Sequence, residues 1–316
     1  MDSSAGGALV TGGAGFIGSH LVEALLAQGR RVKVLDNLST GKLSNLESVR
    51  PQITFIQGDI RDAGTLNAAV RETEVVFHLA AKVSVPWTVE YPVASAEVNE
   101  LGTLAVLQAA RRNGVRRVVF ASSCAVYGDD PRLPKREEMV PRPQSPYAVQ
   151  KLAGELYARL YHGQYGLETV CLRYFNVYGP RQDPGSPYSG VISIFLTRAA
   201  EKKAPAIYGD GNQSRDFVFV QDVVQANLLA ADADQASGRV FNVGCGSFVQ
   251  INHLWERIGQ MTGLTLKPTY MDARPGDVLL SVAGIGLAKT VLGFAPQCSF
   301  ETGLALTYDW YRENRT

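Results

Sequence analysis

Residues 11–18 of the chain read TGGAGFIG, and this glycine-rich stretch decides the fold. The short apolar run ALV at residues 8–10 precedes it, and apolar residues at helical spacing follow it at Ile17, Leu21 and Leu25. A strand that turns through glycines into a helix commonly binds the pyrophosphate of a dinucleotide, because the helix N-terminus offers free N–H groups and a partial positive charge. The stretch therefore predicts a strand, a tight turn and a helix that together bind a dinucleotide.

Each glycine of the motif has a predicted task. Gly12 and Gly13 allow a turn too tight for side chains, and Gly15 lets the backbone approach a pyrophosphate closely. Gly18 lets the helix pack closely on the strand. The spacing is GxGxxG when counted from Gly13 and GxxGxxG when counted from Gly12, so the motif gains its meaning from the strand and helix patterns around it.

A second apolar run, at residues 32–35, ends at Asp36. A carboxylate at this point can accept hydrogen bonds from both hydroxyls of an adenosine ribose, and it repels a 2′-phosphate. We therefore predict NAD rather than NADP as the cofactor. The alternative is that Asp36 merely caps a loop.

Length and charge set the class of protein. With 316 residues and a formal net charge of +1, the chain suits one large α/β domain with a smaller lobe. The mixed charges predict neither nucleic acid nor a membrane surface as a partner. No apolar run approaches the roughly 18 residues of a membrane span, and a first strand near Ala8 leaves no room for a signal peptide.

The metal-binding residue types are scattered. The four cysteines form no CxxC pair, and the four histidines lack HExxH spacing. We therefore expect no metal site and a reducing, cytoplasmic location.

The rest of the chain alternates short apolar runs with helical patterns, which is typical of a doubly wound parallel (Rossmann) sheet of the α/β class. We expect residues 1–175 to form this domain and residues 176–316 to form mainly a smaller C-terminal α/β substrate lobe, with residues 217–247 returning to the first domain. The predicted strands are residues 8–10, 32–35, 53–57, 75–80, 118–121 and 169–174. The predicted helices include residues 93–112, a helix from Pro146, and residues 252–263 and 302–313.

Two polar residues stand out along these strands. Asp59 follows the strand at residues 53–57, at the sheet edge where cofactors bind, so its carboxylate can accept from an adenine amino group. His78 lies inside the strand at residues 75–80, and we interpret it as a packed residue rather than a base. The small residues that follow His78 allow the backbone to lie against a nicotinamide.

Tyr147 and Lys151 are four residues apart and share one helix face. A fixed ammonium and a positive nicotinamide ring both stabilise a phenolate, so we expect the pKa of Tyr147 to fall from its usual value of about 10. Tyr147 can then take a proton from a sugar hydroxyl as hydride leaves the same carbon. Ser123 ends the strand before this helix and can hydrogen-bond that hydroxyl. The alternative is an ordinary exposed helix pair.

The same helix carries two apolar rows, with Leu152, Leu156 and Leu160 in one and Tyr157 and Tyr161 in the other. One sheet face cannot cover both rows. We therefore expect a homodimer through the helices near residues 93–112 and 146–163.

Nine segments of residues 9–311 together resemble the extended short-chain dehydrogenase/reductase (NAD-dependent epimerase/dehydratase) family, most closely its UDP-hexose and UDP-N-acetylhexosamine 4-epimerases. They are TGGAGFIG, DNLSTG, GDI, HLAA, SSCAVYG, SPYAVQK, RYFNVYGPRQDP, SRDFVFVQD and RPGD. The resemblance implies a Rossmann domain with tightly held NAD, a lobe for a UDP-sugar, and a 4-epimerase that oxidises C4 transiently and returns hydride to the opposite face.

The resemblance also implies roles for particular residues. The catalytic group would be Ser123, Tyr147 and Lys151. The cofactor would be bound by Gly12, Gly15, Phe16, Ile17, Asp36, Asn37, Ser39, Thr40, Gly41, Asp59, Ile60, Leu79, Ala80, Ala81, Asn99, Tyr147, Lys151 and Phe175. The UDP-sugar would be bound by Ser84, Ser123, Asn176, Gly190, Val191, Tyr208, Arg215, Arg274, Asp277 and Ser281.

Two alternatives remain beside a 4-epimerase. Dehydratases of this family have an Asp-Glu pair after the active-site hydroxyl and the decarboxylases a Glu there, whereas this chain has Cys124 and Ala125. A noncatalytic NAD-sensing protein would be expected to lose Tyr147 or Lys151. In the epimerases that this chain resembles, a bulky side chain at the position of Ser281 closes the sugar pocket against a 2-acetamido group. The small Ser281 therefore implies that a 2-acetamido sugar fits as well as a plain hexose.

Overall fold

A seven-stranded parallel sheet forms the centre of the structure, a computed structural model that describes residues 6–183, 190–273 and 279–314. The strand order is β11-β6-β5-β4-β1-β2-β3, so the order reverses between β1 and β4. In open α/β sheets, ligands bind at such a reversal, outside the carboxyl ends of the strands. The strands are β1 (Ala8–Thr11), β2 (Val32–Asp36), β3 (Ile53–Gln57), β4 (Val75–His78), β5 (Arg117–Ser123), β6 (Glu168–Tyr174) and β11 (Arg239–Val243). The predicted doubly wound parallel sheet is confirmed.

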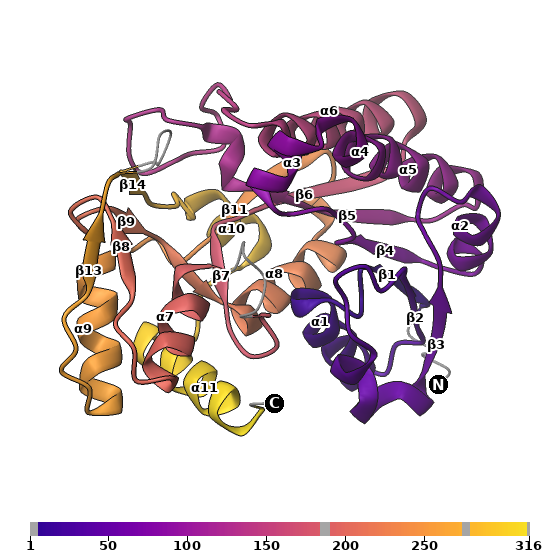
Figure 1. The fold of residues 1–316 in the computed structure, drawn as a ribbon. Helices are drawn as coiled ribbons and strands as arrows, with labels where there is room; N and C mark the ends of the chain where they lie inside the picture. The colour runs from indigo at the N-terminus through magenta and orange to yellow at the C-terminus, as the bar shows by residue number, and fades with distance from the viewer. Residues whose placement is uncertain (1–5, 184–189, 274–278, 315–316) are drawn as a thin grey trace.

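Helices cover both faces of this sheet (Figure 1). Leu9 and Val76 face one layer while Val10 and Phe77 face the other, because successive side chains of a strand point to opposite sides. The first layer contains α2 (Ala63–Val70), α5 (Gly102–Arg112) and α6 (Pro146–Tyr165), and the second contains α1 (Phe16–Ala27) and α8 (Val220–Asp232). Short 3-10 segments lie at Leu43–Gln52, Cys124–Tyr127 and Asp234–Ala236. Two apolar cores result, one on each side of the sheet.

The helix predicted over residues 93–112 has an irregular centre. It consists of α4 (Pro92–Ala96), a π-helical turn over Glu97–Leu101 and α5, preceded by the short α3 (Val85–Glu90). A π turn inserts an extra residue into the helical repeat, so the side chains after it change face. Asn99 lies inside this turn and is buried.

The C-terminal lobe packs around its own apolar core, which includes Phe195, Trp255 and Leu304. Its helices are α7 (Val191–Ala200), α9 (Ile251–Thr262) and α11 (Phe300–Glu313), with α10 (Gly286–Leu292) beside β11. The first three lie together away from β1 to β3 in Figure 1. Three small sheets complete the lobe. Two of them have two strands each: β10 (Phe217–Phe219) pairs with β7 (Asn176–Tyr178), and β13 (Thr269–Met271) pairs with β8 (Ala206–Tyr208). In the third, β12 (Val249–Gln250) and β14 (Leu280–Ser281) lie on either side of β9 (Ser214–Arg215). The helices predicted near residues 252–263 and 302–313 correspond to α9 and α11.

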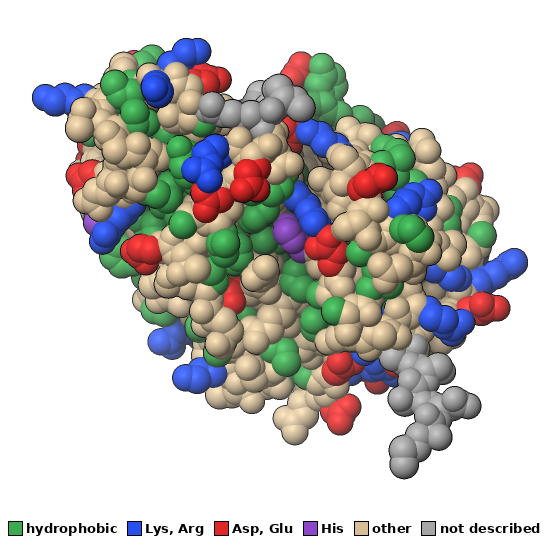
Figure 2. All heavy atoms as spheres, turned by 90° about the horizontal axis from the view of Figure 1, so that it is seen from below, with side chains coloured by type: hydrophobic (Ala, Val, Ile, Leu, Met, Phe, Trp, Pro, Cys, Tyr) green, Lys and Arg blue, Asp and Glu red, His purple; other side chains and the backbone are tan. Residues whose placement is uncertain are grey.

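Charges of both signs are interspersed over the face shown in Figure 2. No helix in the described part of the chain is long and apolar enough to cross a membrane. Within the same residues, no cluster of three or more His, Cys, Asp or Glu side chains is arranged to hold a metal ion.

Candidate active site

A cavity of about 750 Å³ lies at the carboxyl ends of the central strands, where the strand order reverses. Every residue predicted to bind the cofactor lines this cavity except Asn99. Ser123, Tyr147 and Lys151 line it too, so the structure brings the predicted catalytic group to the predicted cofactor site. Sequence reasoning missed other lining residues, among them Lys42, Asn45, Lys82, Arg181 and Asp183.

The glycine-rich turn forms a cradle that side chains would fill. Gly12 has a φ of +71°, and a Cβ on it would lie 2.8 Å from the nitrogen of Ala80. A Cβ on Gly18 would lie 2.2 Å from the carbonyl oxygen of Gly12. Helix α1 starts at Phe16 with Gly15 as its N-cap, and no side chain caps it. The first N–H groups of α1 are therefore available to an anion, which fits the pyrophosphate of a dinucleotide.

Asp36 supplies a buried carboxylate at the end of β2. Its Oδ2 accepts a hydrogen bond from the N–H of Ala14 at 2.9 Å, and its Oδ1 accepts from the N–H of Leu38 at 2.8 Å. Burial raises the pKa of Asp36, and these two hydrogen bonds oppose the increase. Carboxylate oxygens accept more than one hydrogen bond each, so Asp36 can also accept from ribose hydroxyls. This carboxylate acceptor fits the ribose of NAD and disfavours a 2′-phosphate.

Asp59 lines the cavity but already has partners. The Arg61 guanidinium donates to both of its carboxylate oxygens at 2.9 Å, and Asn37 donates to Oδ2 at 3.0 Å. The hydrogen bond from Arg61 is the main reason that the pKa of Asp59 lies well below its usual range. Asp59 therefore stays a charged acceptor in the wall of the cavity.

Asn99 lies behind the wall of the cavity. Its Oδ1 accepts from the N–H of Lys82 at 2.7 Å, and its Nδ2 donates to the carbonyl of Lys82 at 2.9 Å and to Oε1 of Gln150 at 2.8 Å. Lys82 lines the cavity. Asn99, predicted as a cofactor contact, thus fixes the segment that forms this wall.

The three predicted catalytic side chains come from β5 and α6. Ser123 ends β5, and Ser145 caps α6 by accepting from the N–H of Ala148 at 3.2 Å. This cap fixes the start of the helix at Pro146, so that Tyr147 and Lys151 occupy its first two turns. The Nζ of Lys151 lies 5.8 Å from the centre of the Tyr147 ring.

Burial dominates the ionisation of both groups. It raises the pKa of Tyr147 to about 12, against a hydrogen bond to Ser123, and it lowers the pKa of Lys151 to about 8, against the charge of Glu155. The expected decrease in the pKa of Tyr147 is therefore wrong for the polypeptide alone. The reason is that desolvation outweighs the hydrogen bond to Ser123. The Nζ of Lys151 donates to the carbonyl of Ala121 at 2.7 Å.

Two other candidate groups are packed residues. His78 is buried between the hydroxyls of Thr11 and Thr103, at 2.8 and 3.0 Å, and burial lowers its pKa to about 3. It stays neutral near pH 7 and does not line the cavity, as expected of a packed strand residue. Burial raises the pKa of the Cys124 thiol to about 11, so this residue is no thiolate nucleophile at neutral pH.

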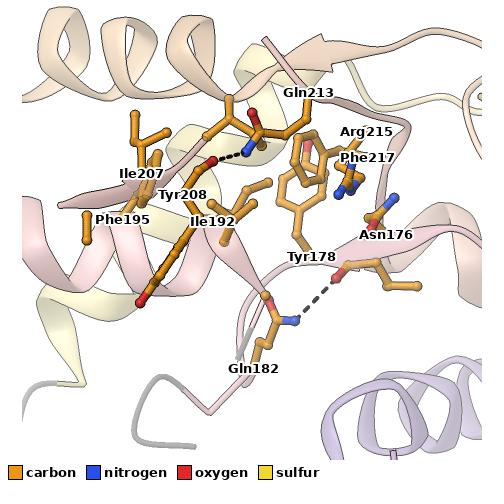
Figure 3. A pocket seen from close by; sticks show the side chains of 15 residues that line it. Asn176, Tyr178, Gln182, Ile192, Phe195, Ile207, Tyr208, Gln213, Arg215 and Phe217 are labelled. Atoms are coloured by element: carbon orange, nitrogen blue, oxygen red, sulfur yellow. Dashed lines mark hydrogen bonds between the residues drawn. The ribbon is translucent and has the colours of Figure 1, made fainter. Parts of the chain in front are cut away.

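A second, smaller cavity of about 230 Å³ lies in the C-terminal lobe (Figure 3). The predicted substrate residues that line it are Asn176, Gly190, Val191, Tyr208 and Arg215. Figure 3 shows the Arg215 guanidinium near the Asn176 amide, with Ile207 and Tyr208 further along the cavity. The two cavities share Val177, Gln182 and Gly190, so they adjoin.

Gln182 at this junction was not predicted. Its Oε1 accepts from the hydroxyl of Ser193 at 2.7 Å, and its Nε2 donates to the carbonyl of Val177 at 3.2 Å. The hydroxyl of Tyr311 donates to its backbone carbonyl. A glutamine in a loop gives no signal of such a role, because these partners come from three separate segments of the chain.

The remaining predicted substrate residues lie elsewhere. Ser84 caps α3 by accepting from the N–H of Trp87 at 3.1 Å, and it lines neither cavity. Ser281 is half-buried in β14, directly opposite Arg215 of β9, and also lines neither. Arg274 and Asp277 lie outside the described residues.

Comparison with known proteins identifies the family. Residues 8–244 match the model of the NAD dependent epimerase/dehydratase family. A protein of Methanocaldococcus jannaschii named putative UDP-glucose 4-epimerase is 40% identical, over 97% of this chain and 98% of that protein.

Two solved structures agree with this match. The UDP-N-acetylglucosamine 4-epimerase from Methanobrevibacter ruminantium, in complex with UDP-N-acetylmuramic acid, has a TM-score of 0.95 and 41% identity over 99% of this chain and 100% of that one. The UDP-glucose 4-epimerase of Thermus thermophilus, in complex with NAD, has a TM-score of 0.88 and 42% identity over 98% and 99% of the two chains. Together with the glycine cradle and Asp36, these matches show that the chain belongs to the NAD-dependent epimerase/dehydratase family and uses NAD as its cofactor.

Proposed function

We propose that the protein is a UDP-sugar 4-epimerase. The observation that carries this proposal is the junction of the two cavities: the one lined by Ser123, Tyr147 and Lys151 opens beside the one lined by Arg215 and its neighbours. A nucleotide held in the smaller cavity would extend its sugar toward the hydroxyl of Tyr147. A redox cofactor and a single proton acceptor at that point suffice to oxidise and reduce one carbinol carbon.

The chain's own residues move and hold the proton. Tyr147 takes the proton from the C4 hydroxyl and later gives it back, and Ser123 hydrogen-bonds the same oxygen. Lys151 supports the phenolate with its positive charge. NAD, when bound, supplies the hydride acceptor and donor for C4. Rotation of the sugar between the two hydride transfers inverts C4.

The smaller cavity suits the UDP part of the substrate. Arg215 and, by resemblance, Arg274 would pair with the diphosphate, since guanidinium groups bind phosphate oxygens bidentately. Asn176 lies beside Arg215, and the aromatic and aliphatic side chains of Tyr208 and Ile207 continue the wall. An apolar wall with a few placed polar groups is typical of a nucleotide site.

Ser123 is followed by residues that disfavour a dehydratase or decarboxylase. Elimination of water needs a proton donor and acceptor beside C5 and C6. Cys124 has its pKa raised to about 11 by burial, and Ala125 carries no proton to transfer. A noncatalytic NAD sensor is disfavoured too, because Tyr147 and Lys151 both line the cofactor cavity.

Incubation with a panel of UDP-sugars tests the proposal. UDP-glucose, UDP-galactose, UDP-N-acetylglucosamine and UDP-N-acetylgalactosamine would each be incubated without added NAD, and the products resolved by NMR. We expect interconversion of C4 epimers, with NAD released only on denaturation of the protein. A requirement for stoichiometric NAD with formation of NADH would instead show a dehydrogenase.

By resemblance to epimerases in which a bulky side chain at the position of Ser281 closes the sugar pocket, we expect acetamido sugars among the substrates. In the structure Ser281 lies opposite Arg215, outside the linings of both cavities. A tyrosine in its place should exclude the acetamido group sterically while sparing plain hexoses. The measurement is the ratio of kcat/KM for UDP-N-acetylglucosamine to that for UDP-glucose in wild type and Ser281→Tyr. An unchanged ratio would reject Ser281 as the gate.

The exposed apolar residues Val93, Leu101, Leu156 and Leu160 support a further proposal, that two copies associate through α4, the π-helical turn after it and α6. Each of these side chains is at least half exposed, and sedimentation velocity would measure the mass of the assembly.

The division of the chain into two domains near residue 175 is also a proposal, with β11 and α8 of the later segment packed on the first domain.

A further inference from the structure

Asp216 is a fully buried carboxylate between β9 and β10 that bonds to two distant segments of the chain. Its Oδ1 accepts from the N–H of Cys245 at 2.7 Å. Its Oδ2 accepts from the N–H of Gly246 and from that of Ala283, both at 3.0 Å. One side chain therefore holds the loop after β11 and the loop after β14 against β9.

β9 and β14 carry residues of the proposed substrate site. Arg215 directly precedes Asp216, and Ser281 is two residues before Ala283. The backbone carbonyl of Asp216 accepts from both the N–H and the Nδ2 of Asn176, each at 3.1 Å. Three segments that contribute to the nucleotide-sugar site thus meet at one residue that itself lines neither cavity.

We propose that Asp216 is the positioning residue of the nucleotide-sugar site, which sets the relative placement of Arg215, Asn176 and the segment after Ser281. This inference rests on the proposed function, since it assumes that these residues bind the substrate. Asp216 acts through its neighbours and does not touch the substrate.

Only a carboxylate suits this position. Three N–H groups point at its two oxygens, and an ionised carboxylate has acceptor sites for all three. An asparagine of the same shape would direct an NH₂ group at one or two of these donors. Burial raises the pKa of Asp216 to about 6 against the three hydrogen bonds, so the group is charged at neutral pH.

Gly244 shows how closely the segments approach each other. A Cβ on this residue would lie 2.6 Å from the Cβ of Ala283 and 3.0 Å from the Oδ2 of Asp216. Alanine at this position would crowd Ala283 most and the carboxylate as well, while it leaves the chemical identity of the carboxylate unchanged. Gly244→Ala therefore tests the same contact from its other side.

Calorimetric titration of the NAD-loaded protein with UDP tests the proposal. Asp216→Asn should raise the Kd for UDP by about tenfold or more, which corresponds to the loss of one charge-assisted hydrogen bond. The KM for the UDP-sugar should rise in parallel, with kcat and the content of bound NAD nearly unchanged. Gly244→Ala should act in the same direction, and it provides the test if the Asn variant fails to fold.

Asp222 provides a matched control. It is also a buried aspartate, and its carboxylate accepts from the N–H groups of Gln297 at 2.7 Å and Cys298 at 3.3 Å, which lie in the segment before α11. Asp222→Asn should reduce stability without changing the Kd for UDP.

Wild-type affinity in both Asp216→Asn and Gly244→Ala would overturn the inference and leave the proposed function intact. An equal increase in Kd in Asp222→Asn would overturn it as well, because a general loss of stability would then explain the effect. Failure of the wild-type protein to bind UDP would refute the proposed function and this inference together.

Discussion

Replacing Tyr147 with phenylalanine is expected to lower kcat by roughly 10²- to 10⁴-fold, the usual effect of removing a general base. The substitution removes only the hydroxyl group. Tyr147 lines the larger cavity beside Ser123, with which its hydroxyl interacts. Tyr147 does not line the smaller cavity, so the Kd for UDP should stay at the wild-type value. Steady-state kinetics and calorimetric titration with UDP measure the two quantities separately.

Tyr161→Phe on the same helix is the matched control. The hydroxyl of Tyr161 hydrogen-bonds the side chain of Gln108 at 3.0 Å and lies outside both cavities, so this variant should keep its activity. Ser123→Ala should cost less than Tyr147→Phe, because it removes a hydrogen bond and leaves the proton acceptor. A Tyr147→Phe variant with near-normal kcat would refute the assigned mechanism.

The second large effect is expected for Lys151→Met, with a loss in kcat of roughly 10²- to 10³-fold. Lys151 is buried, and its charge is the nearby cation that can favour ionisation of Tyr147. The methionine should also weaken NAD binding, since Lys151 lines the cofactor cavity. Turnover at saturating substrate and the NAD content of the purified variant would be measured.

The pH profile of this variant distinguishes an electrostatic role from a structural one. Without the ammonium, Tyr147 needs a higher pH to ionise, so the rising limb of kcat should move to higher pH. In the ligand-free protein the pKa of Lys151 is about 8, so in wild type the ammonium loses its charge as the pH rises through about 8 and stops favouring the phenolate. Lys151→Met has no ammonium and therefore shows no such loss. Parallel profiles for the two proteins would show that Lys151 acts only as a packing residue.

Most of the central domain can be predicted from the sequence, because its signals are local. The glycines of TGGAGFIG, the apolar strands and the start of α6 at Pro146 all follow from short-range rules. The position of Tyr147 and Lys151 on one helix face follows in the same way. These features specify the fold and place the candidate catalytic group at the cofactor site.

Other parts of the site depend on contacts that local patterns do not reveal. Asn99 lies in a π turn, where the regular helical spacing no longer indicates which face a residue occupies. The strands β9, β12 and β14 have two residues each, too few for any periodicity. Among the residues that the structure describes, the side chain of Asp216 bonds to backbone N–H groups of remote loops, and backbone donors leave no mark in the sequence.

The pKa of Tyr147 shows a different limit of prediction from the sequence. The sequence indicates that a cation lies one helical turn away, but it does not indicate how completely both groups are buried. Burial reverses the sign of the shift in the polypeptide alone. In the proposed mechanism, the positive ring of bound NAD would supply the further charge that lowers this pKa.

Deuterium at C4 of the substrate tests the central proposal most directly. UDP-glucose carrying deuterium at C4 would be incubated with the purified protein, and the product analysed by NMR and mass spectrometry. The proposed mechanism predicts UDP-galactose that retains the deuterium at C4, because the same hydride leaves and returns to that carbon. Loss of the deuterium to solvent, or its transfer to C6 as in a dehydratase, would contradict the mechanism.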